Sequence, residues 1–237
     1  MSLSKTPLSP SAERFIQSVL DKEPAIAVFD CDGTLWEGNS GELFFDWEME
    51  RGLVSPQVAA ALRDRYALYR QGGVSEDDMC GEMVTMHQGL SVAEIERAVE
   101  DFFPALIAPG IFPEMLALTL ALKKSGCEVW AISSTNDWVV RYGVREFGID
   151  DDRVIAACVY TNDGHVTDRL IRVPSGEGKA IAVREIIRRV PDAVFGNSRW
   201  DQAMLELARH AYAINPNPDL EEVARERGWN IYKPSVP

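Results

Sequence analysis

Long apolar segments are absent from this sequence of 237 residues. No uninterrupted hydrophobic run approaches the roughly 18 residues that a membrane-spanning helix needs, so we expect no membrane segment. The first fifteen residues, MSLSKTPLSPSAERF, lack the apolar stretch of a secretion signal, and none is expected. Cysteine is also scarce. The four cysteines lie far apart without a CxxC pair, which argues against a disulfide scaffold or zinc site and favours reduced thiols in the cytoplasm.

Basic residues are outnumbered, with 24 Lys and Arg against 37 Asp and Glu and a net charge of −13. No basic run is present that would displace the counterions of a nucleic acid, so we expect no nucleic-acid partner. A small anionic substrate remains compatible, because it responds to local groups rather than to net charge. The composition, 46% hydrophobic and 26% charged, is that of a globular protein with one large domain or one domain carrying an insertion.

Short apolar runs that end in small polar residues predict buried parallel strands, at 25–29, 128–132, 193–195 and 211–214. Helical patterns alternate with them, at 112–124, 138–147, 179–189, 202–209 and 219–227. This alternation predicts an α/β fold with a doubly wound, Rossmann-like parallel sheet. A hairpin is expected at Asn162-Asp163-Gly164. Ligands bind such sheets at the carboxyl ends of the strands, where each polar cluster falls.

Residues 37–109 break the alternation of strands and helices. Four successive helices are expected there, at 41–52, 55–71, 75–88 and 91–103. Serines mark three of the predicted helix starts, and glycines mark helix ends. We therefore expect a small α-helical bundle inserted as a cap domain over residues 37–109, with 1–36 and 110–237 forming the α/β core.

Two carboxylates, Asp30 and Asp32 in DCDGT, follow the first predicted strand. Such a pair can share a divalent cation, with one carboxylate attacking phosphorus while the other moves a proton. The same residue types are common where a strand turns, so the motif alone leaves a structural role open. An EF-hand is excluded, because its glycine is the sixth loop residue and here the glycine comes fourth.

Polar side chains also follow the later strands. Ser133 ends the second strand, where its hydroxyl can hold a phosphoryl oxygen, although Ser-Ser-Thr is also a common helix N-cap. Lys179 opens a helix after Ser-Gly-Glu-Gly, in a sequence that matches neither a P-loop nor a dinucleotide-binding fingerprint. A solvated lysine is the alternative for Lys179. Asn197 and Asp201 follow the run at 193–195 and offer oxygen ligands for a hard metal.

The four clusters FDCDGT, ISST, GEGK and GNSRWD resemble, in this order, the four motifs of the haloacid dehalogenase-like (HAD) phosphohydrolase superfamily. The inserted helices resemble the cap of its branch that includes phosphoserine and phosphocholine phosphatases. The resemblance extends from Ile26 to the segment that begins at Ile214. It implies a Mg²⁺-dependent phosphatase that hydrolyses a small phosphomonoester metabolite through an aspartyl-phosphate.

The resemblance also implies a role for each matching residue. Asp30 would be the nucleophile, and Asp32 would be the general acid and then the general base. The phosphate would be bound by Ser133, Ser134 and Lys179. The Mg²⁺ would be held by Asp30, the backbone carbonyl of Asp32, and Asn197, while Asp201 would orient the metal's waters or Lys179. Asn197 departs from the family pattern, which has aspartate at that position.

Substrate choice is expected to come from residues near the first motif. The candidates include Glu42, which could receive an amino group, and Trp36 as an aromatic contact, together with Phe45, Trp47, Arg63, Arg65 and Arg70; a role in the core of the cap is the alternative. His87 shows no metal-ligand spacing and is interpreted as structural or solvated. Two other functions stay open on the same fold: a phosphotransferase or mutase that passes phosphate to a second alcohol, and a non-catalytic binding protein, for which Asn197 is the only supporting feature.

Overall fold

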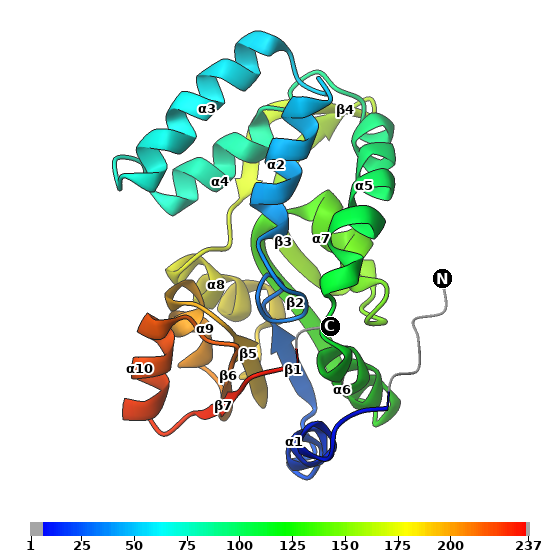
Figure 1. The fold of residues 1–237 in the computed structure, drawn as a ribbon, viewed down its shortest axis with the longest axis vertical. Coiled ribbons are helices and arrows are strands. Elements are labelled where there is room, and N and C mark those ends of the chain that lie inside the picture. The colour runs from blue at the N-terminus through cyan, green and yellow to red at the C-terminus, as the bar shows by residue number, and fades with distance from the viewer. Residues whose placement is uncertain (1–6, 236–237) are drawn as a thin grey trace.

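A seven-stranded sheet forms the centre of the protein, which the computed structural model describes over residues 7–235 (Figure 1). Residues 1–6, part of the stretch considered for a secretion signal, lie outside the described residues. The strand order is β4-β3-β2-β1-β5-β6-β7, and every neighbouring pair is parallel except β3 and β4. The strands are β1 (Ile26–Phe29), β2 (Glu128–Asn136), β3 (Val154–Asn162), β4 (His165–Arg172), β5 (Ala193–Gly196), β6 (His210–Ile214) and β7 (Asn230–Tyr232).

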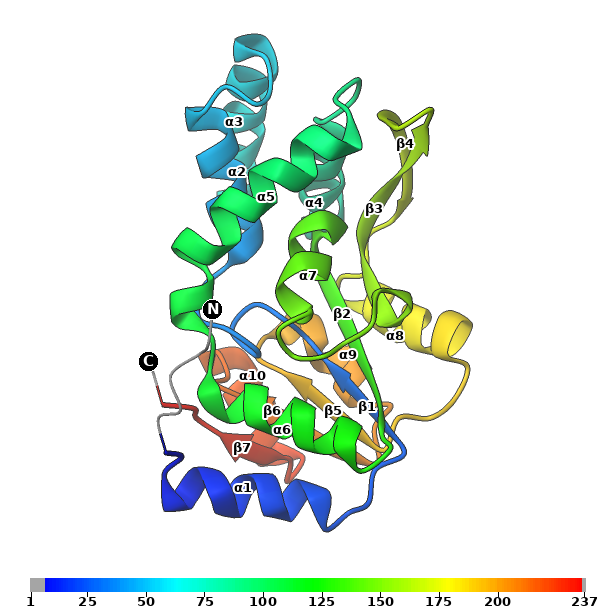
Figure 2. The same cartoon turned by 90° about the vertical axis from the view of Figure 1, so that its right-hand side faces the viewer.

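Helices cover both faces of the sheet, which confirms the predicted doubly wound α/β fold (Figure 2). One face carries α1 (Pro10–Leu20), α6 (Pro113–Lys124) and α7 (Asp137–Val144). The other carries α8 (Glu177–Ala182), α9 (Gln202–Leu205) and α10 (Pro218–Glu226). Side chains of a strand alternate between its faces, and β1 accordingly sends Ala27 and Phe29 into one apolar cluster and Ile26 and Val28 into the other.

A helical segment lies between β1 and β2, where the sequence predicts four helices. It consists of α2 (Ser40–Glu50), α3 (Pro56–Arg70), α4 (Glu76–Thr85) and α5 (Val92–Leu106). Ser55, Ser75 and Ser91 each cap the helix that follows, because their side chains accept a hydrogen bond from its first turn. The segment has an apolar cluster of its own, which includes Phe45, Met49, Leu62 and Met79.

The predicted hairpin is confirmed by β3 and β4, which meet at a turn where Asp163 has a φ of 48° and Gly164 a φ of 76°. Its tip lies beside the helical segment (Figure 2). The amide of Gly89 donates to the carbonyl of Val166 over 2.9 Å, and that of Val92 donates to Gly164 over 2.9 Å. The helices therefore contact a hairpin that belongs, by sequence, to the second part of the α/β core.

The structure differs from the sequence predictions in four elements. The helix predicted over 179–189 is divided into α8 and a π-helical turn, Val183–Ile187, which stops where Arg188 adopts a left-handed φ of 59°. Of the helix predicted over 202–209, only the short α9 is helical, and a 3-10 turn, Arg199–Asp201, precedes it. Helix α1 and strand β7 were not predicted. Among the helices of residues 7–235, none has the length and apolar character needed to traverse a bilayer.

Candidate active site

The chain turns sharply at the carboxyl end of β1, and this turn brings two of the polar clusters together. Gly33 has a φ of +74°, a left-handed conformation that favours glycine. A Cβ atom at Gly33 would also lie 1.9 Å from the side-chain nitrogen of Asn197, which follows β5. Glycine is therefore needed here for both backbone conformation and space, and it allows the loop that carries Asn197 to approach the loop that carries Asp30 and Asp32.

Lys179 joins the polar clusters by contacting two buried carboxylates. Its ammonium group lies 2.6 Å from Asp30 Oδ1 and 2.5 Å from Asp201 Oδ1. All three side chains are almost fully buried, with residue exposures of 2% for Lys179, 5% for Asp30 and 0% for Asp201. Asp201 Oδ2 accepts hydrogen bonds from the amides of Asn197 and Ser198, at 2.9 and 3.0 Å, which fixes this carboxylate relative to Lys179.

The charges of this cluster perturb each other. Burial and the neighbouring carboxylate of Asp201 raise the pKa of Asp30 to about 7, against the lowering effect of Lys179. Burial alone would lower the pKa of Lys179, but the carboxylates of Asp201 and Asp30 raise it above its usual value. Lys179 is therefore a fixed cation beside Asp30, rather than the solvated lysine that the sequence left open.

Asp32 is held by hydrogen bonds to both carboxylate oxygens. Its Oδ1 accepts from the indole N–H of Trp36 over 2.6 Å and from the backbone amide of Ser40 over 2.8 Å. Its Oδ2 accepts from the hydroxyl of Thr135 over 2.8 Å. Sequence reasoning did not identify Thr135, although it lies two residues after Ser133 on β2, a spacing that tends to place side chains on the same face of a strand.

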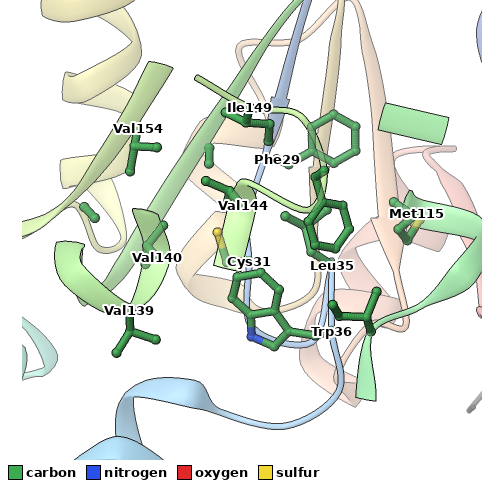
Figure 3. Packing of buried hydrophobic residues seen from close by; sticks show 14 of the residues in the cluster. Phe29, Cys31, Leu35, Trp36, Met115, Val139, Val140, Val144, Ile149 and Val154 are labelled. Atoms are coloured by element: carbon green, nitrogen blue, oxygen red, sulfur yellow. The ribbon is translucent and has the colours of Figure 1, made fainter. Parts of the chain in front are cut away.

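Trp36 occupies a different place from the one predicted. Its side chain is fully buried among apolar residues (Figure 3), and it is not among the residues that line the cavity above Asp30. The indole ring packs edge-on against Phe103, with ring centres 5.3 Å apart. The prediction that Trp36 contacts a substrate directly is therefore corrected: Trp36 contacts Asp32 and does not line the cavity. Cys31 points into the same apolar cluster, and burial raises the pKa of its thiol.

A cavity of about 1090 Å³ lies between the carboxyl ends of the strands and the helical segment. Its lining contains each remaining predicted site residue except Asp201: Asp30, Asp32, Glu42, Ser133, Ser134, Lys179 and Asn197. Ser175 also lines it, and its buried hydroxyl has no hydrogen-bond partner among residues 7–235. Ser175 was not singled out from the sequence. The cavity thus joins the four polar clusters into one candidate site.

The helical wall of the cavity carries more negative than positive charge. Glu42 lies there, with Arg70 Nη1 3.5 Å from its Oε1. Glu76 and Asp77 also line this wall, together with the ring of Tyr66. Glu42 is therefore placed to contact a bound molecule, but it shares its carboxylate with Arg70.

A buried pair, Glu48 and His87, links α2 to the end of α4. Glu48 Oε2 lies 2.6 Å from His87 Nε2, and the other ring nitrogen of His87 lies 3.1 Å from the carbonyl of Val84. Both side chains are almost completely buried. His87 is thus structural, as the sequence suggested, but its acidic partner lies 39 residues away and could not be identified from spacing.

The residues at the site offer oxygen atoms rather than a cluster of acidic, histidine or cysteine ligands. Within residues 7–235, no group of three or more His, Cys, Asp or Glu side chains is arranged to hold a metal. The predicted set consists instead of one carboxylate, one backbone carbonyl and the amide of Asn197. These are hard oxygen donors of the type that Mg²⁺ takes. The amide of Asn197 also lies where a Cβ atom on residue 33 would otherwise be, beside the Asp30 loop.

Comparison with known proteins gives consistent matches along most of the chain. A family model described as haloacid dehalogenase-like hydrolase matches residues 27–206. A histidinol-phosphatase of Neisseria meningitidis is 26% identical over 217 residues, which cover 87% of this chain and 97% of that protein. A phosphoserine phosphatase of Mycobacterium tuberculosis is 29% identical over 231 residues, which cover 89% of this chain and 73% of that protein.

Solved structures match the fold. A protein of unknown function from Bordetella pertussis superposes with a TM-score of 0.76 at 24% identity, covering 87% of this chain and 97% of its own. A substrate-bound phosphoserine phosphatase superposes with a TM-score of 0.59 at 17% identity, covering 88% of this chain and 92% of its own. At these identities the two structures show a common fold.

Proposed function

Since the chain belongs to the haloacid dehalogenase-like hydrolase family, we propose that it hydrolyses small phosphate monoesters by transferring the phosphoryl group to Asp30. A phosphoric monoester hydrolase is the enzyme class that the family and the phosphatase relatives support. The covalent mechanism, the use of Mg²⁺ and the kind of substrate are our proposals. The observation that carries them is the contact of buried Lys179 with Asp30 at the floor of the cavity.

The proposed reaction has two steps. In the first, a carboxylate oxygen of Asp30 attacks phosphorus, the bond to the leaving oxygen breaks, and Asp32 gives that oxygen a proton. In the second, Asp32 takes a proton from water as the water oxygen attacks phosphorus, which releases phosphate and restores Asp30. Lys179 offsets the negative charge of Asp30 and of the phosphoryl oxygens, which would otherwise repel each other. Ser133 and Ser134 line the same floor and donate to the phosphoryl oxygens.

Mg²⁺ fits the oxygen donors described above. We propose that Asp30, the carbonyl of Asp32 and Asn197 hold it, with Asp201 acting indirectly through its contacts with Lys179 and the Asn197 backbone. When bound, the ion supplies positive charge beside the phosphate and so reduces its repulsion from Asp30.

The substrate proposed from the cavity is a phosphate monoester that carries a cationic group. The acidic excess on the helical wall, with Glu42 among its members, favours an ammonium or a similar cation at the end of the molecule away from the phosphate. Phosphoserine and histidinol phosphate, the esters named for two relatives, both carry an amino group. We propose that residues 37–109 act as the cap that encloses this end, in the cytoplasmic setting expected from the four free cysteines.

A screen of phosphate esters tests this function. Free phosphate is measured with and without Mg²⁺ for phosphoserine, histidinol phosphate, phosphocholine, phosphoethanolamine and sugar phosphates. We expect Mg²⁺-dependent release, fastest with an amino-substituted ester. Release of a new ester in preference to phosphate when an acceptor alcohol is added would favour a phosphotransferase. Binding of esters without turnover of any of them would favour a non-catalytic protein.

The role of Glu42 is tested separately. Glu42→Gln should raise KM for the best amino-substituted ester and leave p-nitrophenyl phosphate nearly unchanged, because the latter has no cation. Glu37→Gln is the matched control, since Glu37 is exposed and lies outside the cavity lining. Equal effects of Glu42→Gln on both esters would show that Glu42 supports the structure rather than the substrate.

A further inference from the structure

The carboxylate of Asp32 is held asymmetrically. At Oδ1, the partners are the indole N–H of Trp36 and the backbone N–H of Ser40, two groups that can only donate hydrogen bonds. At Oδ2, the partner is the hydroxyl of Thr135, which can donate or accept. A proton on Oδ1 would face two donors that cannot accept it. A proton on Oδ2 would face an oxygen that can turn and accept it.

The groups around Oδ1 have little freedom to rearrange. Trp36 is fully buried, and its ring contacts Phe103 and the region of Gly143, where a Cβ atom would lie 3.1 Å from the indole ring. Ser40 is the first residue of α2, so its amide is fixed by the helix itself. The two donors therefore define the orientation of the Asp32 carboxylate.

The same helix start packs against Thr135. A Cβ atom on Gly41 would lie 2.7 Å from Thr135 Oγ1, so the first turn of α2 closely covers this hydroxyl. Thr135 is itself only 7% exposed. Thr135 also lines the cavity, and Oδ2 of Asp32 is the side-chain partner of its hydroxyl.

We propose that Trp36 and Thr135 are positioning residues for the proton transfer by Asp32, an inference that rests on the proposed function. Trp36, with the Ser40 amide, keeps Oδ1 turned away from the reaction as a permanent acceptor. Thr135 presents Oδ2, which gives its proton to the leaving oxygen when the phosphorus–oxygen bond breaks and takes one from water in the second step. The Thr135 hydroxyl accepts from the carboxyl form until the proton moves to the leaving oxygen, and it donates to the carboxylate form that remains.

The test compares variants at position 135 on esters with poor and good leaving groups. Thr135→Val keeps the shape and removes the hydroxyl. We expect it to lower kcat for alkyl esters by about 10–100-fold, the worth of one hydrogen bond to a charged group. The loss on p-nitrophenyl phosphate should be much smaller, because its leaving oxygen needs little protonation, and KM should stay level. Thr135→Ser keeps the hydroxyl and should restore most of kcat.

A second comparison separates positioning from structural support. In an Asp32→Asn background, Thr135→Val should cost little further activity, because the group that it positions no longer transfers a proton. Trp36→Phe should show the same dependence on the leaving group as Thr135→Val. Thr119→Val is the matched control, since Thr119 is a buried threonine on α6 whose hydroxyl donates to the carbonyl of Leu116.

The outcomes distinguish this inference from the proposed function. If wild type releases phosphate but Thr135→Val folds and loses equally on both kinds of ester, or loses nothing, the positioning role is wrong and the function stands. Failure of Thr135→Ser to restore kcat would also overturn it. If folded wild type releases no phosphate from any ester, the proposed function fails and this inference fails with it.

Discussion

Replacing Lys179 by methionine tests whether the site is a buried charge cluster. The ammonium of Lys179 is the partner of both Asp30 and Asp201, at 2.6 and 2.5 Å. Methionine is also unbranched and similar in length, so the change removes the charge with little loss of packing. Two carboxylates that are 5% and 0% exposed then lose their cation.

Removing one partner of a buried ion pair costs about 3–5 kcal/mol, because the remaining charge is left uncompensated. For a protein of this size, each kcal/mol corresponds to about 2–4 °C in Tm, so we expect Lys179→Met to lower Tm by about 6–20 °C. The loss should be larger at pH 8 than at pH 6. The pKa of Asp30, already raised to about 7, rises further without Lys179, and the neutral carboxyl present at lower pH costs less to bury.

The assay is urea and thermal unfolding of chelator-treated protein, so that no metal ion replaces the missing charge. A companion variant, Lys179→Met with Asp201→Asn, removes one of the two uncompensated carboxylates and should regain part of the stability without regaining activity. A Lys179→Met protein within about 1 kcal/mol of wild type at pH 8 would show that Lys179 does not stabilise a buried charge cluster, since that is the value of an exposed ion pair rather than a buried one.

Three further predictions concern the metal, the buried pair and the cluster at neutral pH. Asn197→Asp should tighten Mg²⁺ binding by about 1–2 kcal/mol, roughly tenfold, because most of the added attraction is offset by desolvation and by repulsion from Asp30. Asn197→Ala should weaken Mg²⁺ binding. Calorimetry with Mg²⁺ alone measures the three affinities, and one shared affinity would show that Asn197 is not a ligand. Burial alone would lower the pKa of His87, but the Glu48 carboxylate raises it above 6.5. The full contribution of this pair to the free energy of unfolding is therefore present below about pH 6.5, and it is lost as pH rises through the pKa of His87 in the folded state. Urea unfolding should therefore show the gap between wild type and Glu48→Gln narrowing from pH 6 to pH 9, and a constant gap would contradict the ion pair. In metal-free wild type, the raised pKa of Asp30 means that the native state binds more protons than the unfolded state. The free energy of unfolding should therefore fall between about pH 4 and pH 8. In Asp30→Asn, which lacks this carboxyl group, it should fall less steeply over the same range.

The sequence was most informative where a strand ends. Short apolar runs followed by polar clusters predicted that Asp30, Ser133 and Asn197 would face one edge of a parallel sheet, because strand direction fixes which ends meet. The close contact of Gly33 with Asn197 follows from the pairing of β1 with β5. This pairing cannot be predicted from the sequence of either strand alone.

The remaining features depend on contacts between distant segments. Trp36 stands beside the first motif and suggested a substrate contact, but its burial is set by Phe103 on α5 and Phe147 in the turn after α7, both far along the chain. Glu48 on α2 is paired with His87 in the turn after α4, and neither position shows a sequence pattern that would identify the other. The π-helical turn at Val183–Ile187 has the apolar spacing of an ordinary helix, so the sequence predicted one continuous helix there.

If Asp30 receives the phosphoryl group, the phosphorylated protein can be trapped during turnover. Wild-type protein and Mg²⁺ are mixed with the best ester from the screen, quenched in acid within one turnover, and digested for mass spectrometry. We expect one added phosphoryl group on the peptide that contains Asp30, and none in Asp30→Asn, which should also lose turnover. Rapid phosphate release without a phosphorylated peptide, or substantial turnover by Asp30→Asn, would contradict this transfer to Asp30.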